Sequence, residues 1–224
     1  MSVPAIEPAQ KTAARVVGFL YIATNITAMV AFAIRNRTMT LRNPAQMAKS
    51  IDASETLFRF GIVTEIVTIA AVLALAAGLH IILRTVDRNL SLLALLWRIV
   101  ENIVIVVAPL AEIAMLALAR TDAPQVQTWM PALYRVYGAA FNTGFIFLGL
   151  GSALFSYLWW RSNYIPRALA AFGIFASFAI AIASLLIIVW PPIARLMSMT
   201  YMAPMGIYEF GLGGWLLIKG IGAR

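Results

Sequence analysis

The chain contains no cysteine and only one histidine among its 224 residues. Disulfides, thiolate metal sites and cysteine nucleophiles are therefore excluded, and the redox compartment stays open. A zinc site of the usual kind needs several Cys or His ligands, so we predict no bound metal and no cofactor. The single histidine, His80, is expected to be an interfacial or packed residue, and a serine nucleophile would have only this one histidine as a base.

Charged residues are also scarce, because they make up 12% of the sequence against about 25% in an ordinary soluble domain. Hydrophobic residues make up 62%, and the mean hydropathy is +0.88. A soluble fold could not bury this much apolar surface. A helix of about 20 apolar residues, in contrast, crosses a bilayer with its backbone hydrogen bonds satisfied internally. The composition therefore predicts an all-α, polytopic membrane helical bundle.

The formal net charge is +8, which in a soluble protein would suggest nucleic acid. Here the Lys and Arg residues lie mostly at the ends of apolar runs and in short connections, and no basic cluster is interleaved with aromatics. We therefore expect no nucleic-acid partner. Orientation of the chain in an anionic membrane accounts for the charge.

Apolar runs predict six transmembrane spans within a single helical domain over residues 1–224, after a disordered lead at 1–10. Ala31-Phe32-Ala33 matches the small-x-small pattern of a signal-peptide cleavage site, but the run before it exceeds the usual ~7–15 residues, so we expect the first span to be retained. Pro109 predicts a kink in the third span. The spans cover about 16–34, 56–83, 90–119, 131–160, 166–190 and 203–218.

A short amphipathic helix is predicted between the first and second spans. Asn43 followed by Pro44 is typical of an N-cap with proline at the first helical position, and the helix would run to about Asp52. Met47 and Ile51, four residues apart, would place an apolar face in the headgroup region. A plain solvated loop is the alternative.

Six spans place both termini on the same side of the membrane. The side of the termini then carries eight Lys and Arg residues and the opposite side six, so the positive-inside rule favours cytoplasmic termini. The eight are Lys11, Arg15, Arg84, Arg88, Arg161, Arg167, Lys219 and Arg224, and the six are Arg35, Arg37, Arg42, Lys49, Arg120 and Arg195.

Ionisable residues inside the predicted spans are the main functional signal. Each costs about 2.5–3.5 kcal/mol on insertion scales and normally faces protein, water or an opposite charge. Arg98, Glu101 and Glu112 share one face of the third span, which should point into the bundle. Arg98 and Glu101 are close enough to pair, whereas Glu112 is expected to be unpaired near the kink.

Depth along the spans, at ~1.5 Å per residue, places several polar residues in the same half of the membrane. We predict that they line a polar cavity, floored by Arg98 and Glu101 and open toward the long first loop, with Asn25 as a further contributor. Such a cavity would bind or move a small molecule, a lipid headgroup or a proton. The predicted lining is Glu65, Arg98, Glu101, Glu112, Arg135, Asn142 and Glu209.

Two other classes of function remain open, so the sequence does not decide whether the protein is an enzyme. Buried pairs such as Glu112 with Arg135 would only fix helix packing in a structural or assembly partner. Alternatively, Glu101 or Glu209 would be the general base of a membrane-embedded enzyme acting on a lipid or isoprenoid, with Arg98 holding a phosphate or carboxylate.

The expected partners are membrane lipids and a small-molecule or lipid ligand. The chain shows no evident inverted repeat of the kind common in transporters. A homodimer would compensate for this lack.

Five segments are distinctive in their order and spacing along nearly the whole chain. They are Arg15–Tyr21 (RVVGFLY), Leu57–Gly61 (LFRFG), Trp97–Asn102 (WRIVEN), Phe155–Arg167 (FSYLWWRSNYIPR) and Tyr208–Gly220 (YEFGLGGWLLIKG). Together they resemble the uncharacterised bacterial membrane family catalogued as domain of unknown function 4386. The resemblance implies a bacterial inner-membrane protein of about six helices and supplies no activity or catalytic residues. Ala170, where the family usually has glycine, is a departure.

Overall fold

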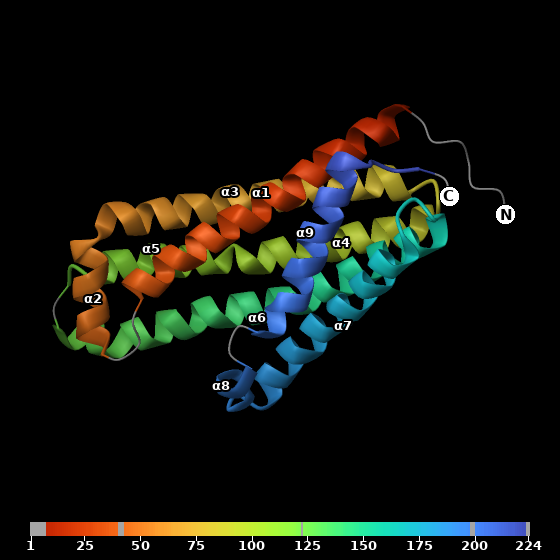
Figure 1. Cartoon of the computed structure of the whole chain (residues 1–224). Helices are drawn as coiled ribbons and strands as arrows, with labels where there is room; N and C mark the ends of the chain where they lie inside the picture. The colour runs from red at the N-terminus through yellow and green to blue at the C-terminus, as the bar shows by residue number, and fades with distance from the viewer. Residues whose placement is uncertain (1–7, 40–42, 122, 198–199, 223–224) are drawn as a thin grey trace. The chain divides into compact units, whose positions relative to one another are not determined.

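The computed structural model describes residues 8–39, 43–121, 123–197 and 200–222 (Figure 1). Within these residues every regular element is a helix and none is a strand, which confirms the all-α prediction. The elements are α1 (Pro8–Thr38), α2 (Pro44–Ala53), α3 (Glu55–Leu83), α4 (Arg88–Ile105), α5 (Val107–Leu118), α6 (Ala123–Ser162), α7 (Arg167–Val189), α8 (Ile193–Met197), the 3-10 helix η1 (Thr200–Met202) and α9 (Ala203–Ile218).

Five helices of the described chain are long and apolar enough to cross a membrane, namely α1, α3, α4 together with α5, α6 and α7. Helix α9 coincides with the predicted sixth span. Its 16 residues extend about 24 Å at ~1.5 Å per residue, whereas the hydrocarbon core of a bilayer is about 30 Å thick. The predicted number of six spans is therefore approximate.

Two helix starts differ from the predicted boundaries. Helix α1 begins at Pro8, so the end of the predicted disordered lead is helical, while residues 1–7 lie outside the described part of the chain. Helix α6 begins at Ala123 rather than at 131, and Pro131 lies inside it. Pro124 is consistent with the earlier start. Proline is well tolerated in the first turn of a helix, because the N–H that it lacks would have no partner within the helix there.

The described residues form two compact units. Helices α1, α3, α4 and α6 each have residues in both units. Unit 1 comprises Met1–Asn25, Ala71–Asn102 and Asn142–Arg224, and unit 2 comprises Ile26–Ala70 and Ile103–Phe141. A single domain over the whole chain stays a prediction.

The short helix α2 belongs to unit 2 and confirms the predicted cap. The Asn43 side chain accepts a hydrogen bond from the Ala45 amide at 2.9 Å, and Pro44 is the first helical residue. Met47 and Ile51 are 1% and 0% exposed, so the apolar face of α2 covers protein and the predicted contact with headgroups is wrong. The unit 2 core contains Met39, Met47, Ala48, Ile51, Phe58, Ile62, Met115, Leu116, Val126 and Met130.

The helix predicted over 90–119 is interrupted at Val106, between α4 and α5. Pro109 has no N–H, so the Ile105 carbonyl lacks the partner four residues on. The next hydrogen bond, from the Leu110 amide to the Val106 carbonyl, is long at 3.5 Å. The predicted disruption of this helix by Pro109 is confirmed.

Glycines let the helices of unit 1 approach closely. A Cβ atom at Gly18 of α1 would lie 2.8 Å from the Leu217 amide nitrogen and 2.9 Å from the Gly213 carbonyl oxygen of α9. Because α1 and α9 touch through their backbones here, Tyr21 and Asn25, one and two turns further along α1, lie on the same face as this contact. Helix α9 also packs along α7 (Figure 1).

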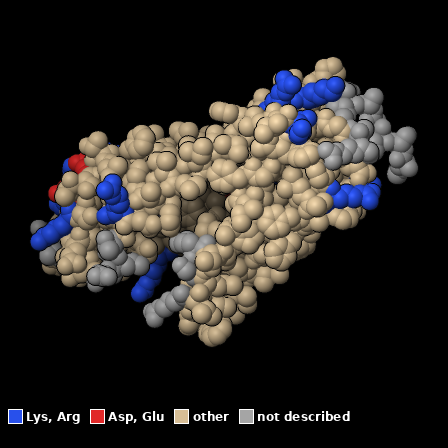
Figure 2. Space-filling model, viewed as in Figure 1, with Lys and Arg blue, Asp and Glu red and all other residues tan. Residues whose placement is uncertain are grey.

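Large apolar side chains cover much of the exterior of the helices. Phe19, Phe60 and Phe175 are among many such residues that are more than half exposed. Figure 2 shows the same character on one face, where most of the surface is uncharged and Lys and Arg gather in a few groups. So much exposed apolar surface indicates contact with lipid.

Candidate functional site

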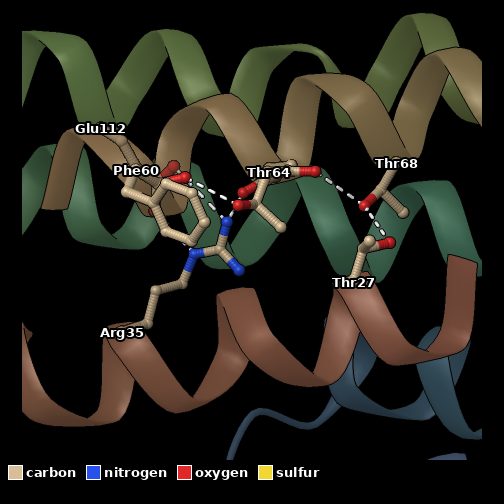
Figure 3. Close-up of polar contacts among 7 residues, drawn as sticks. Thr27, Arg35, Phe60, Thr64, Thr68 and Glu112 are labelled. Carbon is tan, nitrogen blue, oxygen red and sulfur yellow. Dashed lines mark hydrogen bonds and ion pairs between the residues drawn. The ribbon is translucent and has the colours of Figure 1, made fainter. Parts of the chain in front are cut away.

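Arg35 is the centre of a buried ionic cluster in unit 2. It extends from α1 and pairs with Glu65 of α3 and with Glu112 of α5, where its Nε donates to Glu112 Oε1 at 2.6 Å (Figure 3). All three residues are less than one-tenth exposed. We call Arg35, Glu65 and Glu112 the Arg35 cluster.

Aromatic rings and hydroxyl groups complete the surroundings of the Arg35 cluster. The Arg35 guanidinium lies 5.1 Å from the centre of the Tyr137 ring and 5.8 Å from the centre of the Phe141 ring. Both rings belong to α6, and both distances are typical of cation–π interactions. One turn further along α3, the Thr68 hydroxyl lies 2.7 Å from the Thr27 hydroxyl of α1 (Figure 3). One arginine thus contacts three other helices within unit 2.

Arg98 and Glu101 form a second buried pair, in unit 1. Their separation of 2.9 Å, from Arg98 Nη1 to Glu101 Oε2, confirms the pairing predicted from their i, i+3 spacing on α4. Gly151 of α6 leaves room for the arginine, since a Cβ there would lie 3.0 Å from Arg98 Cδ. Among the described residues, the buried Arg98 Nε finds no hydrogen-bond partner.

Glu209 of α9 joins this pair. Arg98 attracts it electrostatically, and Glu101 and Glu209 repel each other. Glu209 accepts a hydrogen bond at 3.0 Å from the Asn25 side chain of α1. We call Arg98, Glu101 and Glu209 the Arg98 cluster.

The two clusters have the same ionic composition. Each contains one guanidinium and two carboxylates within its own unit, so each carries a formal charge of −1 when every group is ionised. Carboxylates without a matching cation are costly at membrane depth. A proton or a bound cation would cancel this charge.

The remaining two predicted lining residues lie outside these clusters. Arg135 is exposed, so its proposed pairing with Glu112 is wrong: Arg35 takes that place, and Glu112 is not the unpaired residue that was expected. Asn142 is half-buried in unit 1 and accepts a hydrogen bond from the Tyr201 hydroxyl at 3.4 Å. Burial raises the pKa of Tyr201, which keeps this hydroxyl protonated as a donor.

The side chain of His80 lies within hydrogen-bond distance of a serine that the sequence pattern did not indicate. Its Nδ1 lies 3.0 Å from the Ser91 hydroxyl within unit 1. Ser91 is 0% exposed, so its hydroxyl does not lie on the protein surface. The contact agrees with the prediction of a packed histidine.

Arg35 is the residue that the sequence pattern does not reveal. It precedes Asn36 and Arg37 at the end of an apolar run, which is typical of a cation flanking a span. The signal that could have found it is helical phase: Ala31, Ile34 and Arg35 are all buried on one face of α1, whereas Arg37 is exposed.

An all-helical fold with five helices able to span a bilayer, and with buried ionic clusters, defines a polytopic helical membrane protein. A family model described as Domain of unknown function (DUF4386) matches residues 16–220. The chain belongs to this family. Comparison with the curated proteins and with the solved structures yields no match.

Proposed function

We propose that the protein is a multi-pass protein of the bacterial inner membrane that binds protons at the Arg35 and Arg98 clusters and moves them within the membrane. The observation behind the proposal is that each unit has one buried arginine for two glutamates: Arg35 is ion-paired with both of its glutamates, and Arg98 is ion-paired with Glu101 and attracts Glu209. Of the ligands expected from the sequence, namely a small molecule, a lipid headgroup or a proton, the proton needs the least space. It also cancels the excess charge of each cluster.

The burial of the carboxyl groups explains why a cluster would hold a proton. Glu65 and Glu112 are 4% and 1% exposed, and both meet the same guanidinium. An uncompensated buried charge costs several kcal/mol even after relaxation of the protein, so a carboxyl group without its own cation takes up a proton instead. We therefore expect one protonated carboxyl in each cluster near neutral pH.

Infrared spectroscopy of the purified protein in lipid nanodiscs tests this proposal, because a protonated carboxyl has a C=O stretch distinct from that of a carboxylate. The wild-type spectrum at pH 7 should contain this band for each cluster. Glu65→Gln and Glu112→Gln should each remove the contribution of the Arg35 cluster, since the glutamate that remains then pairs with Arg35 as a carboxylate. Glu101→Gln and Glu209→Gln should do the same for the Arg98 cluster.

Glu55→Gln is the matched control, because it neutralises an ion-paired glutamate of α3 that lies outside both clusters and whose side chain is 26% exposed. It should leave both bands unchanged. A wild-type spectrum without any protonated-carboxyl band at pH 7 would overturn the proposal.

Proton movement needs a separate measurement. Proteoliposomes that contain a pH-sensitive dye should acidify or alkalinise when a potassium diffusion potential is applied, and Glu209→Gln should slow this response. A proton flux equal to that of empty liposomes would refute proton movement and leave proton binding as the proposed function.

A second candidate function is the fixing of helix packing in a structural partner. It is favoured by the contacts of Arg35 with three other helices within unit 2. Under this function Glu→Gln variants change stability but no proton flux. The enzyme hypothesis has less support, because the Arg98 guanidinium that would hold a phosphate is already paired with Glu101.

We also propose that both termini are cytoplasmic and that the protein forms a homodimer. Because the chain has no cysteine, each introduced thiol is the only one, and impermeant maleimide can report its side of the membrane. In intact cells, Thr121→Cys should react and Thr12→Cys should not; both positions are exposed. Cross-linking in native membranes tests the dimer.

A further inference from the structure

We propose that Glu209, Asn25 and Tyr21 form a binding site for a primary ammonium group, which exchanges with the proton of the Arg98 cluster. The inference rests on the proposed function, because it names a ligand that competes with the proton for the same carboxylate. Three features of unit 1 support it: Glu209 is less buried than Glu101, several oxygen atoms are free to accept hydrogen bonds, and the Arg98 cluster has an excess negative charge.

Access differs between the two carboxylates of the Arg98 cluster. Glu209 and Asn25 are half-buried residues. Glu101 and Arg98 are 4% and 3% exposed and lie inside. A ligand that approaches the cluster therefore meets Glu209 first.

The hydrogen-bond donors of Asn25 are already used. Its Nδ2 donates to the Tyr21 carbonyl at 2.9 Å and to Glu209 Oε2 at 3.0 Å, which accounts for both amide hydrogens and fixes the orientation of the amide. The Asn25 Oδ1 atom can then only accept a hydrogen bond. This atom and Glu209 Oε1 have no hydrogen-bond partner among the described residues.

The Tyr21 hydroxyl is the third polar group without a partner. Tyr21 is 4% exposed, and in the described part of the chain no hydrogen bond to its hydroxyl is present. It interacts electrostatically with Glu209, Arg98 and Glu101, so it belongs to the surroundings of the Arg98 cluster. A hydroxyl can accept hydrogen bonds through its oxygen, so this group is available to a ligand that donates them.

These groups match the chemistry of a primary ammonium. Such a group has three N–H donors, no acceptor and one positive charge. Oxygens of Glu209, Asn25 and Tyr21 supply acceptors, and the charge cancels the formal −1 of the Arg98 cluster. A phosphate or carboxylate ligand would instead meet two carboxylates behind a single arginine.

Exchange with a proton conserves charge. The O–H bond of the protonated Glu209 carboxyl breaks and its proton passes to water, while the ammonium donates hydrogen bonds to the carboxylate that is left. One proton leaves for each ammonium bound. The ammonium could belong to a free amine or to the headgroup of phosphatidylethanolamine.

Calorimetric titration of ethanolamine into the full-length protein tests the inference, in nanodiscs made only of phosphatidylglycerol. Titrations in two buffers of different ionisation enthalpy give the number of protons released, which should be one. Glu209→Gln should weaken binding at least tenfold and abolish proton release. Tyr21→Phe keeps the aromatic ring and should weaken binding severalfold, so it tests the site even if Glu209→Gln fails to fold.

Two controls define the chemistry. Choline has the same charge but no N–H donor, and it should bind at least tenfold more weakly than ethanolamine. Glu55→Gln should bind ethanolamine like the wild type. Equal binding of choline and ethanolamine would overturn the hydrogen-bonded site.

Nanodiscs that contain phosphatidylethanolamine separate the two sources of ammonium. Loss of ethanolamine binding in them supports the lipid headgroup as the occupant, and unchanged binding supports a free amine. If ethanolamine fails to bind, or binds without proton release, the inference is overturned. Infrared bands that disappear in Glu101→Gln would still support the proposed proton binding, so the two failures are distinguishable.

Discussion

Replacing Arg35 with methionine removes the cation to which both Glu65 and Glu112 are ion-paired, and it retains much of the apolar length of the side chain. The substitution therefore separates the charge of Arg35 from its packing. Both carboxylates remain at positions that are less than one-tenth exposed.

The expected loss of stability follows from what these carboxylates lose. Breaking a buried ion pair by removing one partner costs about 3–5 kcal/mol. The cation–π contact with Tyr137, at 5.1 Å, contributes about 1 kcal/mol more. We expect the free energy of unfolding to fall by about 4 kcal/mol, because protonation of the glutamates offsets part of the total.

Unfolding in mixed micelles with increasing SDS, followed by circular dichroism, measures this free energy. The triple variant Arg35→Met, Glu65→Gln, Glu112→Gln should recover at least half of the loss, since no buried charge then remains. Arg37→Ala is the control: Arg37 is exposed at the end of the same helix, and its removal should change stability by less than about 0.5 kcal/mol. An Arg35→Met protein as stable as the Arg37→Ala protein would refute the reasoning.

Three further predictions test the packing around the site, each by the same unfolding measurement. Gly149→Ala should destabilise by about 1–3 kcal/mol, because its Cβ would lie 2.5 Å from a carbonyl oxygen of α7. Gly138→Ala, on the same helix but facing open space, should instead be neutral or slightly stabilising; equal effects would contradict the close helix contact. Asn43→Ala should cost about 1 kcal/mol through loss of the α2 cap, and no change would show that the cap is replaced by water. Tyr208→Phe should cost about 1–2 kcal/mol, because it leaves the buried Ser156 hydroxyl without its 2.9 Å partner; a stability equal to that of the wild type would contradict this bond.

Features that depend on neighbouring residues could be predicted from the sequence. The apolar runs predicted the helices, the Asn43-Pro44 pair predicted the start of α2, and Pro109 predicted the break between α4 and α5. The pairing of Arg98 with Glu101 belongs to the same class, since both lie on one face of one helix. Each of these signals acts over a few residues, so no knowledge of the tertiary structure was needed.

The partner of Glu112 could not be predicted in this way. Helical phase showed correctly that Glu112 faces inward, but it does not tell which helix lies opposite. Arg35 is 77 residues away along the chain and, beside Arg37, resembles a flanking charge. Arg135, the partner expected from depth alone, is exposed because its side of α6 faces outward.

The sequence by itself determined that the chain is a helical membrane protein with ionisable residues inside its spans, because hydropathy and helical period are local properties. Only the tertiary structure decided how these residues are grouped: one arginine with two glutamates in each of the two units. Burial of a charge is tolerated only where an opposite charge lies within a few ångströms, and that neighbour is set by the packing of helices distant in sequence.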